Sequence, residues 1–179
     1  MAKHLWFLRH GEAEPHDARP DYKRRLTPRG EEQSRAAGRA MAALELPFQL
    51  TLTSPLVRAF DTARLACETL GCEPVVEESL SRGFHAGHAL ELARAAGPDR
   101  RVLLVGHNPD FEEVLRDLTG ASVHVKKGGI AAVRLDGDRG KLLLLLRPRE
   151  IARIVGLPSA PTEVHTSLAV ARAAMSSGS

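Results

Sequence analysis

Hydrophobic positions along the chain fall into short unbroken runs separated by longer amphipathic stretches. The run Leu5–Leu8 predicts a buried central strand, because a strand covered on both faces does not alternate between apolar and polar residues. Residues 50–53 and 101–105 predict two more strands, and Val75-Val76 predicts a brief one. Residues 130–135 and 142–146 predict a hairpin around the turn-forming residues 136–140.

Amphipathic segments between these runs predict helices. Thr27 and Ser54 are each followed by proline, the order expected for an N-cap and the first helical residue. We therefore predict helices that begin at these two points and end near residues 44 and 70. Shorter helices are predicted over residues 89–96, 111–118 and 149–156.

Strands and helices alternate as far as residue 120, which predicts an α/β layered fold with a mostly parallel sheet. The 179 residues suit one domain. We expect that domain to span residues 1–156. Residues 157–179, rich in Ser, Ala and Pro, are expected to form a C-terminal tail that is partly helical or disordered.

Composition and charge change this picture little. The 25 basic and 22 acidic residues give a net charge of +3 and the aromatic residues are scattered, so no nucleic-acid partner is expected. The apolar runs at residues 5–8 and 142–146 are too short for a signal peptide or a membrane span. Cys67 and Cys72 are too few for a disulfide framework. We expect a cytoplasmic protein without membrane contact.

Two predicted strands end in unusual residues, Arg9-His10-Gly11 and Gly106-His107-Asn108-Pro109. Ligands of such sheets bind at the carboxyl ends of the strands. Either histidine alone would be read as a structural residue bonded to the backbone. Together, His10 and His107 are expected to point into one crevice and to form a site.

Histidine and arginine in one crevice suit phosphoryl chemistry. An imidazole can attack phosphorus, and the planar fork of arginine matches the phosphoryl oxygens. Arg9 and Arg58 are the candidate anion ligands, Arg58 from the first turn of its predicted helix. A metal site is disfavoured, since no third ligand follows a strand and arginine repels a cation. No serine-nucleophile elbow and no nucleotide-binding loop are present.

Three segments resemble the signatures of the histidine phosphatase superfamily. Residues 8–12 (LRHGE) resemble its Arg-His-Gly signature, residues 53–63 its S-P-x-x-R-A-x-x-T-A helix, and residues 105–109 its V-G-H-N-P loop. The match spans nearly residues 3–147. In its length and in residues 21–30, the chain is most similar to the small SixA-type phosphohistidine phosphatases. The resemblance implies a layered α/β/α sandwich with a mostly parallel central sheet and an antiparallel C-terminal edge.

The resemblance also implies roles for the site residues. His10 would be the nucleophile that becomes phosphohistidine, Arg9 and Arg58 would bind the phosphoryl oxygens, and His107 would stabilise the transferring group. No cofactor and no metal ion are expected.

Three further residues are candidate substrate contacts. Gly11 would keep the loop open for close backbone approach, and Arg24 matches an arginine common in the small members. Asn108 would bond either to the ligand or within the turn before Pro109.

One departure from the family pattern concerns the general acid. Many members carry a glutamate soon after the middle strand, whereas Arg82 stands at the corresponding position here. Glu12 is the nearest carboxylate in sequence and is the candidate proton donor, or else a solvated residue. Cleavage of a phosphoramidate depends less on a general acid than cleavage of an ester, because imidazole is a better leaving group than an alkoxide.

The leading hypothesis is therefore a metal-independent phosphatase that works through phospho-His10 on protein phosphohistidine, with a histidine-containing phosphotransfer protein as the candidate partner. The alternative is a small-molecule phosphomonoesterase of the same mechanism, acting on a sugar phosphate, a nucleotide or a cofactor precursor. A phosphate-binding protein without turnover is a third hypothesis. A mutase would need a retained acid and a second anion pocket, and neither is visible.

Overall fold

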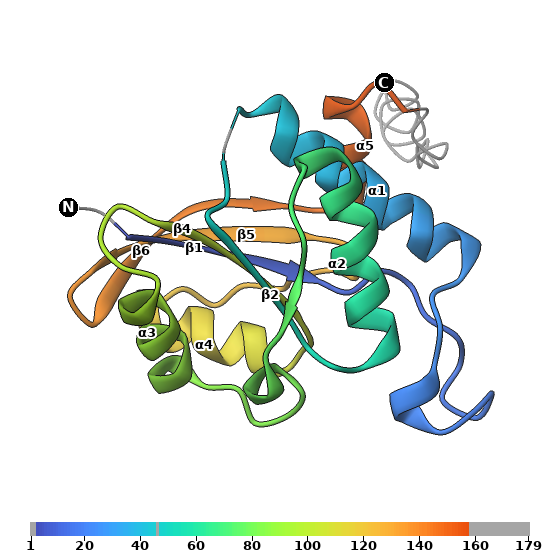
Figure 1. Cartoon of the computed structure of the whole chain (residues 1–179), viewed down its shortest axis with the longest axis horizontal. Helices are drawn as coiled ribbons and strands as arrows, with labels where there is room; N and C mark the ends of the chain where they lie inside the picture. Colours follow the sequence, from blue (N-terminus) through green and yellow to red (C-terminus); the bar gives the residue numbers. More distant parts are fainter. Residues whose placement is uncertain (1–2, 46, 158–179) are drawn as a thin grey trace, which may run out of the picture.

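The computed structural model describes residues 3–45 and 47–157, so the expected tail lies outside the described residues except for Leu157. The fold is built on one six-stranded sheet (Figure 1). Its strands are β1 (Lys3–Arg9), β2 (Leu50–Thr53), β3 (Val75–Val76), β4 (Arg101–Gly106), β5 (Ile130–Asp136) and β6 (Arg139–Leu146). The order is β3-β2-β4-β1-β5-β6.

The first four strands of that order run parallel, whereas β5 pairs antiparallel with β1 and β6 pairs antiparallel with β5. This confirms the expected α/β fold, with its mostly parallel sheet and antiparallel C-terminal edge. The helices are α1 (Pro28–Ala43), α2 (Val57–Leu70), α3 (Ala86–Ala95), α4 (Asp110–Thr119) and α5 (Pro148–Ile154). Two short 3-10 helices, η1 (Asp21–Lys23) and η2 (Glu78–Leu80), lie in loops.

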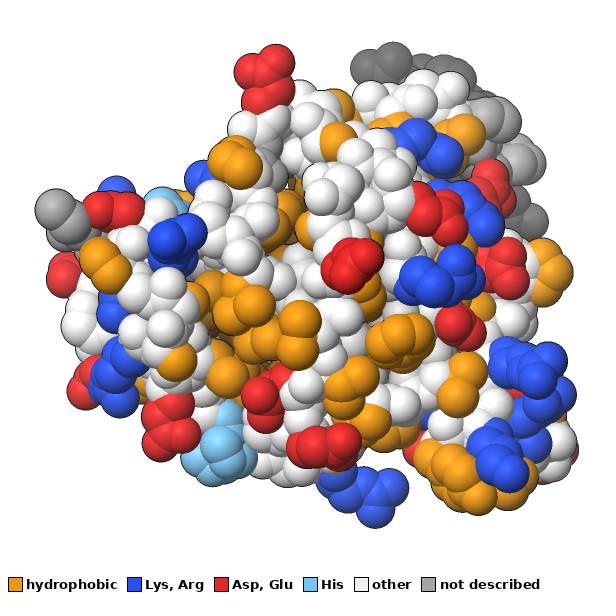
Figure 2. Space-filling view, in the orientation of Figure 1, with side chains coloured by type: hydrophobic (Ala, Val, Ile, Leu, Met, Phe, Trp, Pro, Cys, Tyr) orange, Lys and Arg blue, Asp and Glu red, His pale blue; other side chains and the backbone are white. Residues whose placement is uncertain are grey.

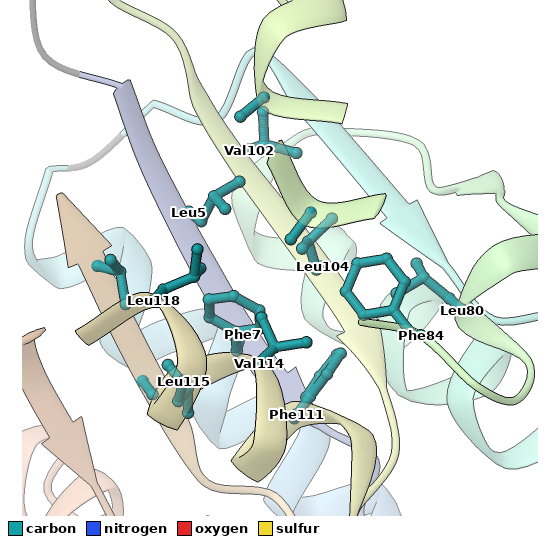
Figure 3. Close-up of a cluster of buried hydrophobic side chains, with 14 of the residues drawn as sticks. Leu5, Phe7, Leu80, Phe84, Val102, Leu104, Phe111, Val114, Leu115 and Leu118 are labelled. Carbon is teal, nitrogen blue, oxygen red and sulfur yellow. The ribbon is translucent and has the colours of Figure 1, made fainter. Parts of the chain in front are cut away.

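Alternate residues of β1 build two separate cores. Trp6 and Leu8 pack with α1, α2 and α5 on one face of the sheet, which Figure 1 shows above the strands. Leu5 and Phe7 pack with α3 and α4 on the other face, where the rings of Phe7 and Phe111 meet edge to face with centroids 5.2 Å apart (Figure 3). The unbroken apolar run of β1 is therefore explained by burial on both faces.

Local signals located most elements, but two helix starts were predicted wrongly. Thr27 caps α1 as expected, since its hydroxyl accepts the amide of Gly30 at 3.1 Å. Helix α2, in contrast, begins at Val57 rather than at Ser54-Pro55, although the Ser54 hydroxyl accepts the amide of Leu56. Helix α3 begins at Ala86, three residues earlier than predicted, since the side chain of His85 caps it. Strand β6 also begins earlier, at Arg139, which leaves a shorter turn than predicted.

The surface is mixed in character. Acidic, basic and hydrophobic side chains are interspersed over the face shown in Figure 2. None of the described helices is long and apolar enough to cross a membrane.

Candidate active site

The two histidines of the site meet because β1 and β4 are parallel neighbours. Arg9 and Gly106 are paired in register, so the residues that follow them leave the sheet side by side. The amide of His10 donates to the carbonyl oxygen of Gly106 at 3.0 Å. The rings of His10 and His107 lie with their centroids 5.1 Å apart, and both side chains are buried. The structure therefore brings His10 and His107 together, as the sequence predicts.

His10 is held in the form that a nucleophile needs. Its Nδ1 atom lies 2.8 Å from the carbonyl oxygen of Gly11. A carbonyl only accepts, so Nδ1 carries the proton and Nε2 keeps its lone pair. Burial and the neighbouring His107 hold the pKa of His10 well below its usual value. The ring is thus neutral at pH 7, with Nε2 free to attack.

Gly11 anchors the loop that follows the nucleophile. Its amide donates to the hydroxyl of Thr62 at 3.1 Å, and Thr62 in turn donates to the carbonyl oxygen of Arg58 at 2.7 Å. A Cβ atom on Gly11 would collide with the backbone carbonyl of Gly30. Glycine is therefore required here because the loop passes close to the N-terminus of α1, and its amide is already committed to Thr62.

Arg9 is the last residue of β1, directly before His10, and is held from the segment before β5. Its Nη1 group donates to the carbonyl oxygen of Val125 at 2.8 Å, while its buried Nε has no partner among the described residues. The Val125 amide donates to Glu112 Oε1 at 2.9 Å. Asn108 Nδ2 donates to the same Glu112 oxygen at 2.5 Å and to the Val125 carbonyl at 3.0 Å.

Asn108 and Glu112 therefore brace the segment that holds Arg9. This places the amide group of Asn108 in the loop framework, which is one of the two roles expected for it. Its Oδ1 atom is buried without a partner among the described residues.

Arg58, near the N-terminus of α2, is the second arginine close to His10 and His107. Its Nη1 and Nη2 groups donate to the backbone carbonyl and to Oδ2 of Asp21, at 2.7 and 3.2 Å. Arg24 joins the same carboxylate, with Nη1 2.8 Å from Asp21 Oδ1. Burial alone would raise the pKa of Asp21, but bonds and charges from Arg24 and Arg58 outweigh it, so the pKa is lowered.

Arg24 thus contributes to the site by holding Asp21. Its Nε group donates to the backbone carbonyl of Glu14 at 2.8 Å, and its side chain is only 4% exposed. Sequence reasoning missed Asp21. Its place directly after Pro20 in the stretch most similar to the small family members was the only signal.

His107 faces the site from the end of β4. Its Nε2 atom lies 2.8 Å from the hydroxyl oxygen of Ser54, and its buried Nδ1 has no partner among the described residues. Burial, reinforced by the charge of Arg58, lowers its pKa to about 4. Ser54 is the second site residue that the sequence does not predict, because Ser-Pro by itself indicates only a helix cap.

The candidate proton donor Glu12 is turned toward α1. Its carboxylate accepts the hydroxyl of Thr27 at 2.9 Å and lies 3.7 Å from Arg29 Nη1. Arg82, at the position where the family pattern has glutamate, is exposed in the loop before α3. The structure thus gives Glu12 partners outside the crevice between His10 and His107.

Three buried nitrogens of residues around His10 have no hydrogen-bond partner in the described part of the chain: Arg9 Nε, Arg58 Nε and His107 Nδ1. Buried donors are normally paired, so unpaired ones need an explanation. Two guanidinium groups and an imidazole around a nucleophilic nitrogen suit a tetrahedral oxyanion. The arrangement can bind a phosphoryl group and present it to His10 Nε2.

Comparisons with known proteins identify the relatives of this chain. The model of the histidine phosphatase superfamily (branch 1) matches residues 5–87. An uncharacterized protein of Picosynechococcus is 36% identical over 159 residues, which cover 81% of this chain and 96% of that protein.

Solved structures show the same fold. A protein histidine phosphatase SixA complexed with tungstate superposes with a TM-score of 0.76 at 23% identity, over 83% of this chain and 99% of that one. A mycobacterial glucosyl-3-phosphoglycerate phosphatase superposes with a TM-score of 0.65 at 18% identity. The match covers 82% of this chain and 100% of that one. The chain belongs to the histidine phosphatase superfamily and is a histidine-type phosphatase.

Proposed function

We propose that this phosphatase hydrolyses protein phosphohistidine by a two-step mechanism that needs no metal ion. In the first step, His10 Nε2 attacks phosphorus, and the bond between phosphorus and the substrate imidazole breaks. In the second step, water attacks phospho-His10, inorganic phosphate leaves, and His10 is regenerated. Arg9 Nε, Arg58 Nε and His107 Nδ1 donate to the three equatorial oxygens in both steps.

The observation that carries this choice of substrate is the state of the carboxylates around the crevice. Asp21 is bound by two arginines that lower its pKa, so it is a poor proton donor. Glu12 accepts a hydrogen bond from Thr27 and lies near Arg29. Neither carboxylate is suited to protonate an alkoxide leaving group.

Phosphohistidine does not require such an acid. When the second ring nitrogen of the substrate carries a proton, cleavage of the P–N bond releases neutral imidazole directly. A site with strong oxyanion donors, in which the described carboxylates Asp21 and Glu12 are already engaged, therefore suits a phosphoramidate better than an alkyl ester. We infer a histidine-containing phosphotransfer protein of the cytoplasm as the partner. The structural neighbour named a protein histidine phosphatase is in line with this choice.

The test compares substrates under matched conditions. The enzyme, in the presence of EDTA, is offered a phosphorylated histidine phosphotransfer domain and a panel of sugar, nucleotide and cofactor-precursor phosphates. We expect a higher kcat/KM, by at least about tenfold, for the phosphotransfer domain. Efficient turnover of one ester and not of the phosphotransfer domain would assign the enzyme to small-molecule metabolism instead.

The intermediate is tested separately. Rapid quenching should trap an acid-labile, alkali-stable phosphoryl group on the wild-type protein, and mass spectrometry should place it on His10. His10→Ala should abolish turnover while retaining part of the affinity for phosphate, since the three donors remain. Full activity of His10→Ala would rule out the mechanism, and inhibition by EDTA that a divalent ion reverses would reveal a metal site.

A further inference from the structure

The two histidines of the site have different partners for their second ring nitrogen. His10 Nδ1 faces a carbonyl, which fixes its proton on that atom. His107 Nε2 faces the hydroxyl of Ser54, which can donate or accept, so atom type alone does not fix the tautomer of His107. The other bond of Ser54 decides the question.

The Ser54 oxygen also accepts the amide of Leu56, at 3.3 Å. An amide N–H can only donate, so the hydroxyl is the acceptor in that bond. Among the described residues, the only other hydrogen bond of this hydroxyl joins it to His107 Nε2, at 2.8 Å. If Nε2 also donated to this oxygen, the hydroxyl proton would be left unpaired in a fully buried position, which is costly. The hydroxyl proton is therefore assigned to the bond with Nε2, which is then the unprotonated nitrogen of the neutral ring.

We propose that Ser54 is a positioning residue that holds His107 in its Nδ1–H tautomer, so that a neutral ring donates a hydrogen bond to the transferring phosphoryl group. His107 Nδ1 is buried and has no partner among the described residues, so an anion would satisfy it. The opposite tautomer would direct a lone pair at the phosphoryl oxygens and repel them. This inference rests on the proposal that the site binds a phosphoryl group.

The two rings would then act as a complementary pair. Both carry their proton on Nδ1, but His10 directs Nε2 at phosphorus whereas His107 directs Nδ1 at oxygen. The low pKa of His107 is compatible with this role, because the ring stays neutral at pH 7 and donates without carrying charge. Ser54 itself is fully buried, so water does not compete for its hydroxyl.

The direct test reads the tautomer without using activity. Imidazole nitrogens are assigned by long-range ¹H–¹⁵N NMR in the wild type, Ser54→Thr and Ser54→Ala. We expect a protonated Nδ1 on His107 in the wild type and in Ser54→Thr, and a mixture of tautomers in Ser54→Ala. A protonated Nε2 in the wild type would overturn the proposal, as would an unchanged tautomer in Ser54→Ala.

The functional test uses the same variants. Ser54→Ala should lower kcat by about 10- to 100-fold and weaken tungstate binding, while Ser54→Thr should retain most of both. Thr51→Val is the matched control. Thr51 lies in β2 and is buried like Ser54, but its hydroxyl bonds to Cys72 and not to a site residue. Equal losses in Ser54→Ala and Thr51→Val would overturn the proposal.

A failure of the proposed substrate would be distinguishable from a failure of this inference. If the wild type hydrolyses only small esters, the choice of phosphohistidine fails, while the NMR result on His107 still stands. If the wild type hydrolyses phosphohistidine but its His107 carries the proton on Nε2, the role of Ser54 fails alone.

Discussion

Asp21 holds Arg58 twice, through its backbone carbonyl at 2.7 Å and through its carboxylate at 3.2 Å. Both terminal nitrogens of the guanidinium are thereby engaged on one side. The Nε group has no partner in the described part of the chain and is free to bind an anion. An exposed 3-10 helix thus orients a buried arginine, and this relationship can be tested by substitution.

Asp21→Ala should reduce both activity and stability. Arg24 and Arg58 would lose their shared counter-ion, and Arg58 would lose one of its two anchors. Because Asp21 is 41% exposed, solvent screens part of the loss, and we expect unfolding to become easier by about 1–3 kcal/mol, with kcat/KM about tenfold lower. Thermal and urea unfolding measure the change in stability, and steady-state kinetics measure the change in kcat/KM. Asp61→Ala, which removes a carboxylate of an exposed pair on α2, is the control and should change little.

Arg58→Ala should raise the barrier by about 2–4 kcal/mol, or roughly 30- to 1,000-fold in kcat/KM, as for other preorganised oxyanion donors. Arg58→Lys should not restore the rate, since an ammonium cannot bind Asp21 through two groups while donating to the phosphoryl oxygens. Arg64→Ala, on the same helix but 52% exposed, serves as the control. A loss of less than tenfold in Arg58→Ala would mean that Arg58 does not bind the transferring group.

Glu112→Ala should disturb the site from outside it. Glu112 Oε1 accepts from Asn108, His124 and Val125, and the Val125 carbonyl in turn fixes Arg9. Loss of this acceptor leaves two partly buried donors unpaired, so we expect a destabilisation of about 1–3 kcal/mol and a weaker affinity for phosphate. Isothermal titration with phosphate and thermal unfolding are the measurements. The neighbouring, exposed Glu113 gives the matched variant Glu113→Ala, and equal effects of the two would exclude the bracing role.

The two active-site histidines should resist protonation in mild acid. Burial lowers the pKa of His10 well below 6.5, and burial and the charge of Arg58 lower that of His107 to about 4. A lowered pKa means that the proton is taken up only at a pH below the usual value, and protonated His10 cannot attack phosphorus. From about pH 7 down to about pH 5, kcat/KM corrected for substrate titration should therefore show no loss from these groups. NMR titration of the free enzyme checks this directly, and a midpoint near 6.5 for either ring would contradict it.

The strands and the two histidines could be predicted because their signals are local. An unbroken apolar run followed by Arg9-His10 marks both a buried strand and the end at which ligands bind, and Val105 and His107 repeat the pattern. The partners of these residues could not be predicted in the same way. Asp21 and Arg58 are 37 positions apart, and a carbonyl such as that of Val125 has no signature in sequence at all.

Ser54 shows how a local signal can hide a distant partner. Ser-Pro predicts a helix cap from its own neighbourhood, and the hydroxyl does accept the amide of Leu56, two residues on. The same hydroxyl also contacts His107, 53 positions away, and nothing in the sequence near Ser54 indicates this contact. The predicted division into residues 1–156 and a tail stays a prediction.

The nucleophile His10 is the residue directly after β1, the strand that separates the two cores. Because β1 packs against helices on both faces, and its last backbone bonds set the position of His10, loosening either helical layer should move the reacting nitrogen. Catalysis is therefore a sensitive reporter of the integrity of the whole fold. During heating, activity should be lost no later than the near-ultraviolet dichroism of Trp6, which lies buried in the same strand.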